Sequence, residues 1–198
     1  MIDHAGNHEE MRKQTCDNCA FHGHEECLRY AHEHGYYISM DTLQKAICKG
    51  NLECVKYLYR NGYKATTNEY ACLLDYGDHV ECLECEAALR NGRIKCFKYI
   101  VKNGYKPTSR SCDMVSCWNN SSVDMLKFLI ECGCIPSVKA CANAARHGKI
   151  RILQYLHEHG YPWDARTTYY ARNYGNIACL EYALERGCPD NYIEKSKK

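Results

Sequence analysis

The chain contains 198 residues, with 26 Lys and Arg against 24 Asp and Glu, so its formal net charge is +2 at pH 7. This balance excludes a strongly basic nucleic-acid-binding protein or an acidic tail protein on composition alone. No apolar run approaches the roughly 18 residues of a membrane helix, and the first residues lack the pattern of a secretory signal, so we expect neither. The unusual feature is a content of 16 Cys, which is typical of disulfide scaffolds and metal-binding proteins.

One sequence block recurs six times along the chain. Each copy closes on a glycine, at Gly35, Gly62, Gly104, Gly133, Gly160 and Gly187, and opens twelve residues earlier. Counted from the opening residue, positions +5 and +8 are apolar in every copy. This spacing predicts an amphipathic helix that ends at the glycine, which we call helix B. A fixed short period of this kind indicates a helical repeat array.

A second helical segment, helix A, is predicted before each block. Its small or apolar core pairs lie seven and four residues before the opening residue: Cys16/Cys19, Leu43/Ala46, Cys85/Ala88, Met114/Cys117, Cys141/Ala144 and Thr168/Ala171. Helix starts are predicted at Ser39, Ser137 and Asp164, and at a capping box that begins with Thr66. Trp118 is expected in the core, because the equivalent position in other copies is apolar.

In chain order, we expect one repeat domain over residues 1–198. Its units are 12–35, 39–62, an irregular unit at 66–91, then 81–104, 109–133, 137–160 and 164–187, followed by a tail at 188–198. The period breaks between Gly62 and Gly104, which are 42 residues apart. There we expect a helix A near 67–76 and one helix near 79–91 that serves as a degenerate helix B and as the next helix A. The fold prediction is an all-α helical repeat solenoid of six to seven helix-turn-helix units and about 13 helices.

The residue pattern of the repeat is similar to that of a known family. Two helices per unit, with small residues on the first, match the ankyrin repeat, shortened from about 33 residues to about 27. The runs 51–58, Asn-Leu-Glu-Cys-Val-Lys-Tyr-Leu, and 159–164, His-Gly-Tyr-Pro-Trp-Asp, resemble ankyrin-repeat proteins of giant and other large cytoplasmic DNA viruses. The resemblance covers about residues 12–190 and departs from the family pattern at 63–92 and 121–123. It implies an ankyrin-type solenoid and a viral protein that acts in the cytoplasm of an infected cell. Only Pro189 to Lys198 remains beyond the repeats, so we expect no ubiquitin-ligase-recruiting module of the kind that such proteins often carry.

The cysteines allow two main interpretations. Cys16, Cys19, His24 and Cys27 are close in sequence and could together bind zinc. Most of the repeat cysteines, however, occupy positions that hold Leu, Ala, Met or Ile in other copies, namely Cys16, Cys19, Cys27, Cys54, Cys96 and Cys179. We therefore expect them in the core and expect no cofactor, with the zinc site as the alternative. Disulfides are a third alternative, which a single cysteine position per helix disfavours.

Six of the ten His lie in the first 34 residues, at positions 4, 8, 22, 24, 32 and 34, among an excess of acidic residues. They are consistent with a pH-sensitive N-terminal cap or with a solvated polar capping unit, which repeat arrays need for solubility. We favour the solvated cap.

Neither catalysis nor a small-molecule substrate is expected. The sequence has no phosphate-cradling glycine loop, no His-Glu-x-x-His helix and no nucleophile elbow. A basic stripe is predicted along the outward face of two consecutive helices B, formed by Lys56, Arg60, Lys98 and Lys102. It makes nucleic-acid binding a lesser alternative, although glutamates at the same positions of other copies favour a simple solvated face.

The default use of a solenoid is to bind another macromolecule through its long surface. We expect the partner at the starts of helices A and in the connecting loops, where the candidate residues are Tyr37, Lys64, Tyr105, Lys106, Trp163, Arg166 and Tyr170. Tyr, Trp and Arg dominate interface energetics, although Trp163 could instead pack on the next helix A. The prediction is a non-enzymatic module that binds a host or viral protein and no membrane. A structural component of a virion or other assembly is the alternative.

Overall fold

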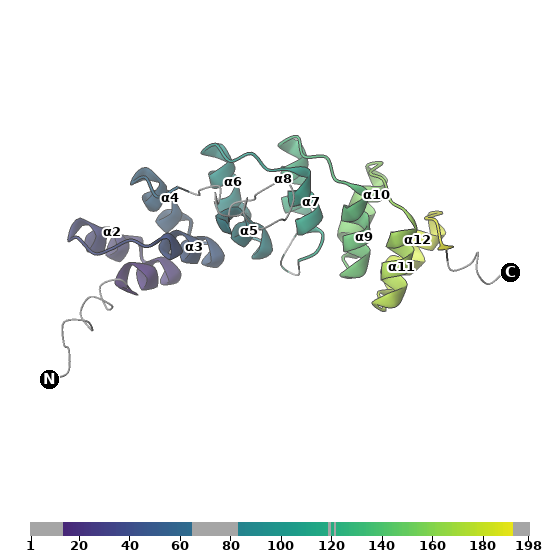
Figure 1. The fold of residues 1–198 in the computed structure, drawn as a ribbon, viewed down its shortest axis with the longest axis horizontal. Coiled ribbons are helices and arrows are strands. Elements are labelled where there is room, and N and C mark those ends of the chain that lie inside the picture. Colours follow the sequence, from purple (N-terminus) through teal and green to yellow (C-terminus); the bar gives the residue numbers. More distant parts are fainter. Residues whose placement is uncertain (1–13, 65–82, 119, 121, 192–198) are drawn as a thin grey trace, which may run out of the picture. The chain divides into compact units, whose positions relative to one another are not determined.

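The computed structural model describes residues 14–64, 83–118, 120 and 122–191, and all regular structure in these ranges is helical. The chain divides into two compact units, Met1–Tyr105 and Lys106–Lys198. Figure 1 labels the helices of both units. The first unit contains a helical segment at residues 14–22, α2 (Glu25–Glu33), α3 (Met40–Lys49), α4 (Leu52–Arg60), α5 (Leu83–Arg90) and α6 (Ile94–Lys102). The second contains α7 (Ser109–Val115), α8 (Val123–Glu131), α9 (Val138–Arg146), α10 (Ile150–Glu158), α11 (Ala165–Asn173) and α12 (Ile177–Glu185). The prediction of an all-α helical repeat is confirmed.

Within each unit, helices of the same kind stack on one another. Helices A pack against helices A, as in the pairs α3 and α5, α7 and α9, and α9 and α11. Helices B pack in the same way, as in α2 and α4, α4 and α6, α8 and α10, and α10 and α12. Each repeat therefore buries its apolar stripe against a neighbouring repeat, which is why a single helix pair could not be stable alone.

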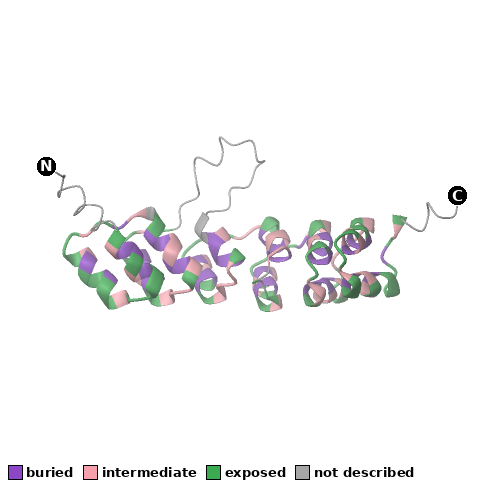
Figure 2. Cartoon of the chain, turned by 90° about the horizontal axis from the view of Figure 1, so that it is seen from below, coloured by how far each residue is buried: buried purple, intermediate pink, exposed green. Residues whose placement is uncertain are grey.

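The core lies where the periodicity predicts it. Position +8 of helix B is buried in all six copies: Ala31, Leu58, Ile100, Leu129, Leu156 and Ala183. Position +5 is buried in five copies, Leu28, Val55, Phe97, Leu126 and Leu153, and half-buried in the last, Leu180. Figure 2 shows the helices with buried residues on one side and exposed residues on the other. The amphipathic pattern thus sets which face of each helix is covered.

Three of the predicted helix starts are confirmed by their capping bonds. Ser39 Oγ accepts from the Thr42 amide at 3.2 Å, Ser137 Oγ from the Lys139 amide at 3.1 Å, and Asp164 Oδ1 from the Arg166 amide at 3.0 Å. These side chains satisfy amides that have no partner inside the helix. The capping box predicted at Thr66 and the helix predicted at 67–76 lie outside the described residues.

Neighbouring repeats are joined by side chains that bind the end of the preceding helix A. Asn51 Nδ2 donates to the carbonyl oxygens of Ala20 and Phe21, at 2.8 and 3.0 Å. Asn176 Nδ2 donates in the same way to Ala145 and Arg146, both at 2.8 Å. Each amide therefore satisfies helix-end carbonyls across a repeat boundary.

Replacing Gly148, which ends α9 at φ +66°, should test this joint. A Cβ added there would lie 2.7 Å from Asn176 Oδ1, so alanine must displace the amide that binds α9 and also strain the backbone. We expect Gly148→Ala to lower the free energy of unfolding by about 2–3 kcal/mol. Gly160→Ala is the matched control, because φ is +75° but no atom lies within 4 Å of the added Cβ, and it should cost about 1 kcal/mol. Equal losses in urea unfolding would show that the joint contributes nothing.

The irregular region is spanned by a direct contact. Arg93 Nε, at the start of α6, donates to the Cys48 carbonyl at the end of α3, at 2.9 Å. In addition α5 packs on α3 as well as on α6. The α5/α6 pair therefore stacks on the α3/α4 pair, and α5 takes the part of helix A predicted for it. The helix near 79–91 was also predicted to serve as a degenerate helix B. That role depends on residues 65–82, which lie outside the described residues.

The register predicted for the unit 109–133 is wrong by two residues. In α7 the buried residues are Ser111, Cys112 and Val115, whereas Met114 and Cys117 are half-buried. Trp118 lies beyond the helix and is half-buried, not in the core. The reason is a longer connection: the cap and the opening residue are 11 positions apart at Ser39 and Gly50 but 13 apart at Thr108 and Ser121. Counting back from the next block therefore misplaces this helix A.

The first residues of the predicted tail belong to the fold. Arg172 of α11 forms a bidentate ion pair with Asp190, with Nη1 to Oδ1 at 3.0 Å and Nη2 to Oδ2 at 2.7 Å. Thr168 Oγ1 also donates to the Pro189 carbonyl at 2.8 Å, and Cys188 is buried. Residues 188–190 thus cover α11.

Candidate interaction surfaces

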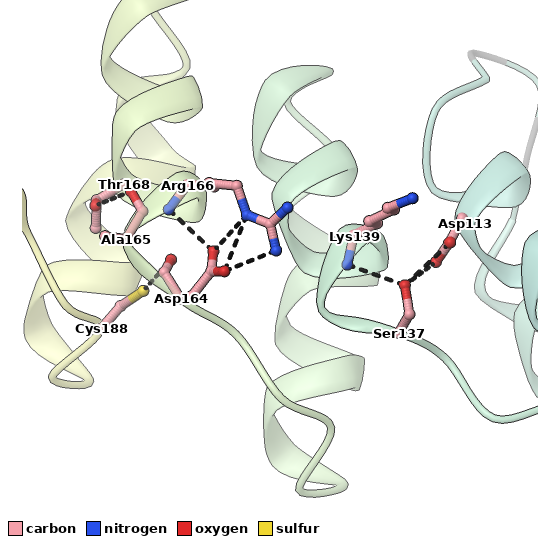
Figure 3. A network of polar contacts seen from close by, with 8 residues as sticks. All are labelled: Asp113, Ser137, Lys139, Asp164, Ala165, Arg166, Thr168 and Cys188. Carbon is pink, nitrogen blue, oxygen red and sulfur yellow. Dashed lines mark hydrogen bonds and ion pairs between the residues drawn. The ribbon is translucent and has the colours of Figure 1, made fainter.

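A carboxylate on one helix A binds the cap of the next helix A in each unit. In the second unit, Ser137 Oγ donates to both oxygens of Asp113, at 2.9 and 3.0 Å (Figure 3). In the first unit, Asp17 occupies the same place: it accepts from Ser39 at 2.9 Å, from Thr42, and from Lys45 Nζ at 2.7 Å. Each carboxylate therefore fixes the start of the following repeat.

The two carboxyl groups differ in charge environment. Burial raises the pKa of Asp17, but the bonds from Lys45, Thr42 and Ser39 outweigh it and lower the pKa overall. Burial raises the pKa of Asp113, and the bond from Ser137 is too weak to reverse the shift. The position of Lys45, six residues after the serine cap, is held by Asn143 in the second unit. The amide of Asn143 reaches only the Asp113 backbone carbonyl, at 3.2 Å.

The predicted partner-binding residues fall into two groups. Tyr37, Lys64, Lys106 and Arg166 are exposed, whereas Tyr105, Trp163 and Tyr170 are half-buried. Arg166 is already engaged, because its guanidinium pairs with the Asp164 carboxylate, Nε to Oδ2 at 2.9 Å and Nη2 to Oδ2 at 2.8 Å (Figure 3). Arg166 and Tyr170 lie one turn apart on α11, in the second unit, whereas Tyr37 and Lys64 belong to the first unit. Whether these residues bind a partner stays a prediction.

The ring of Trp163 contacts rings on two helices B. Its ring stacks on His157 of α10 with centroids 4.0 Å apart and meets Tyr182 of α12 edge-on at 6.4 Å. His157 Nδ1 and the Tyr182 hydroxyl are hydrogen-bonded at 3.0 Å. This cluster joins two repeats.

The first unit repeats the His157 arrangement. His32 Nδ1 and the Tyr57 hydroxyl are 2.8 Å apart, across the α2 and α4 boundary, and Tyr63 Oη lies 3.5 Å from His32 Nε2. The sequence shows why: residues 30–36 and 155–161 share the pattern Tyr-x-His-Glu-His-Gly-Tyr. One histidine of the N-terminal cluster therefore makes a repeat contact instead of belonging to a solvated face.

Several large side chains that sequence reasoning missed are exposed on α11 and the start of α12. Tyr169 is 57% exposed, Tyr174 53% and Ile177 66%. The rings of Tyr169, Tyr170 and Tyr174 touch in series, with centroids 5.5 and 6.4 Å apart. The guanidinium of Arg146, from α9, lies over the Tyr174 ring at 4.9 Å. We call Tyr169, Tyr174, Ile177 and Arg146 the α11 surface. The signal in the sequence was the presence of three tyrosines within residues 169–174.

The predicted basic stripe is present on α4 and α6. Arg60, Lys98 and Lys102 are exposed, while Lys56 is half-buried and pairs with Glu53 at 2.8 Å. Because α4 and α6 pack against each other, these side chains lie on neighbouring helices.

The cysteines are mostly core residues. Cys16, Cys54, Cys96 and Cys179 are buried as expected, but Cys19 is half-buried and Cys27 is exposed. The prediction that Cys27 is buried is wrong, because helix α2 belongs to the first described repeat and no described helix covers its outer side. Cys85 is disulfide-bonded, so the expectation that disulfides are disfavoured is wrong at this position.

Thiol chemistry and metal binding find little support in these cysteines. Burial raises the pKa of Cys16, Cys54, Cys96, Cys179 and Cys188 to about 11 and that of Cys141 to about 12. Such thiols are protonated at neutral pH and are poor nucleophiles. No group of three or more His, Cys, Asp or Glu in the described ranges could hold a metal ion, so the structure does not assemble Cys16, Cys19, His24 and Cys27 as a zinc site.

These features define a helical repeat protein whose distinctive groups lie on outer helix faces. No helix in the described part of the chain has both the length and the apolar character needed to cross a bilayer. Neither a protein-family model nor a curated protein matches the chain. Solved structures do match, among them the human ASB11 ankyrin repeat domain, with 17% sequence identity and a TM-score of 0.34 over 88% of this chain and 69% of that chain.

Proposed function

We propose that this chain is a non-enzymatic, ankyrin-type repeat protein that binds another protein through the α11 surface. The observation that carries the proposal is the exposure of Tyr169, Tyr174 and Ile177 beside Arg146. Exposed rings and an arginine held over one of them combine apolar area with a directional charge, and these residue types supply most of the energy in protein interfaces. The partner should present apolar side chains next to a carboxylate that Arg146 can bind.

The resemblance of the repeat to viral ankyrin proteins extends this proposal. We take the chain to be a viral protein that acts in the cytoplasm of an infected cell on a host or viral protein. Mass spectrometry of purified particles tests this part: a host-directed binder is absent from them, and a stoichiometric amount would instead identify a structural component.

Replacing Tyr174 and Ile177 by alanine tests the surface itself. Both side chains are more than half exposed, so the double variant should keep its helical circular dichroism. We expect at least a tenfold loss of the partner recovered by affinity purification, as for removal of central interface residues. Tyr30→Ala is the matched control, because Tyr30 is 63% exposed on another helix, and it should retain the partner. Equal recovery by the double variant and the wild type would refute the proposed surface.

A further inference from the structure

Two neighbouring helices B in each unit carry opposite charges on their outward faces, whereas α2 (Arg29 and Glu33) and α8 (Lys127 and Glu131) carry one charge of each sign there. Two positions of helix B, +6 and +10, point outward in consecutive repeats. On α4 and α6 they hold Lys56, Arg60, Lys98 and Lys102, and on α10 and α12 they hold Gln154, Glu158, Glu181 and Glu185. We call Arg60, Lys98 and Lys102 the basic ridge, and Glu158, Glu181 and Glu185 the acidic ridge.

Five of the six ridge residues, Lys98 being the exception, make no ion pair in the described part of the chain. All six side chains are exposed. Lys56, which is excluded from the ridge, pairs with Glu53 at 2.8 Å. Elsewhere the helices do pair their charges, as Arg29 does with Glu25 and Arg90 with Glu86. The two ridges are therefore places where one sign of charge accumulates.

Fold stability does not account for this arrangement. Lys98 and Lys102 are four residues apart on one helix, as are Glu181 and Glu185. Like charges at this spacing destabilise a helix. A partner of opposite charge would convert that cost into attraction.

The two ridges also share one geometry. Each lies on two helices B of adjacent repeats that pack together, α4 with α6 and α10 with α12. Packed helices are about 8–10 Å apart, and residues four apart on a helix are separated by about 6 Å. The basic and acidic groups thus follow the same spacing in both directions.

We propose that the basic ridge of one copy of this chain docks on the acidic ridge of a second copy. The acidic ridge is opposite in sign to the basic ridge and equal to it in the number and repeat positions of its charges. Such a contact joins different surfaces of the two copies, so it is heterologous and leads to head-to-tail rings or filaments. It uses residues outside the α11 surface and does not depend on the function proposed above. A nucleic acid would use the basic ridge alone and leave the acidic ridge without a role.

Sedimentation of the full chain at low ionic strength tests the proposal. We expect the mass to rise with protein concentration and the association to weaken at least tenfold when salt is raised to about 0.5 M, because exposed charges are screened. The double variants Arg60→Glu/Lys102→Glu and Glu158→Lys/Glu185→Lys should each remain monomeric. Mixed together, they should associate, because each then presents the ridge that the other lacks.

The controls separate docking from a change in net charge. Arg110→Glu/Lys139→Glu removes two exposed cations from helices A and should associate like the wild type. The fourfold variant that combines both ridge swaps should regain self-association. A wild-type chain that stays monomeric at every concentration, or one that binds duplex DNA or RNA without self-association, overturns the proposal. So does a mixture of the two ridge variants that fails to associate.

Discussion

Replacing Leu153 by alanine is expected to lower the free energy of unfolding by about 3–4 kcal/mol, because the side chain is fully buried and its removal leaves a cavity. Leu153 is at position +5 of α10, whose neighbours α8 and α12 pack on both sides. Rigid packing on both sides leaves little room for the surrounding residues to collapse into the space.

Leu180→Ala provides the matched control. Leu180 is the same residue at the same repeat position of α12, but it is half-buried, so we expect a loss of about 1–2 kcal/mol. Urea unfolding of both variants, followed by circular dichroism, measures the difference. Losses of the same size would mean that burial in the stack does not decide the stability of a repeat.

The repeat core could be predicted because burial follows repeat position closely. Position +8 is buried in all six copies, whether it holds Ala31 or Ile100, since the helix period and the closing glycine set its direction. The helix A of unit 109–133 could not be placed, because two extra residues before Ser121 break the count. The prediction for Cys27 was wrong for another reason. Cys27 occupies a core position of the repeat, but burial also requires a neighbouring repeat.

The surfaces were harder to predict than the core. Composition identified Arg166 and Trp163 as recognition residues, yet Arg166 pairs with Asp164 and Trp163 stacks on His157. A sequence pattern shows which residue types are available, but not which are already engaged by their neighbours. Tyr174 could not be predicted as a surface residue for the converse reason. It follows the end of α11, where nothing in the repeat pattern says whether another repeat covers it.

The contributions of Asp17 and Asp113 to the stability of the fold are expected to change with pH in opposite directions. The pKa of Asp17 is lowered in the folded protein, so its stabilising contribution is present above its ordinary pKa of 3.8 and is lost as the pH falls through the folded pKa. The pKa of Asp113 is raised. Its charged form is therefore unfavourable at neutral pH, and the protein gains stability from this group as the pH falls through the folded pKa.

Asp17→Asn is expected to cost about 2–3 kcal/mol at about pH 7, because it removes charge-assisted bonds to Lys45, Thr42 and Ser39. The loss should shrink below the ordinary pKa of 3.8, where the wild-type carboxyl also becomes neutral. Asp113→Asn should change stability by less than about 1 kcal/mol at about pH 7, and the wild type should gain on this variant as the pH falls. Urea unfolding of both variants at several pH values measures the two trends. A larger loss from Asp113→Asn than from Asp17→Asn at neutral pH would contradict the assignment.

Asn143→Lys should give Asp113 a charge environment like that of Asp17. The new ammonium would stand where Lys45 stands relative to Asp17, six residues after the serine cap, within reach of the Asp113 carboxylate. A cation at that position favours the ionised form, so the pKa of Asp113, followed by NMR titration of its side-chain carboxyl carbon, should fall below its value in the wild type. Lys45→Asn is the reciprocal change and should raise the pKa of Asp17. If neither pKa moves, burial rather than the residue six positions after the cap decides the charge of both carboxyl groups.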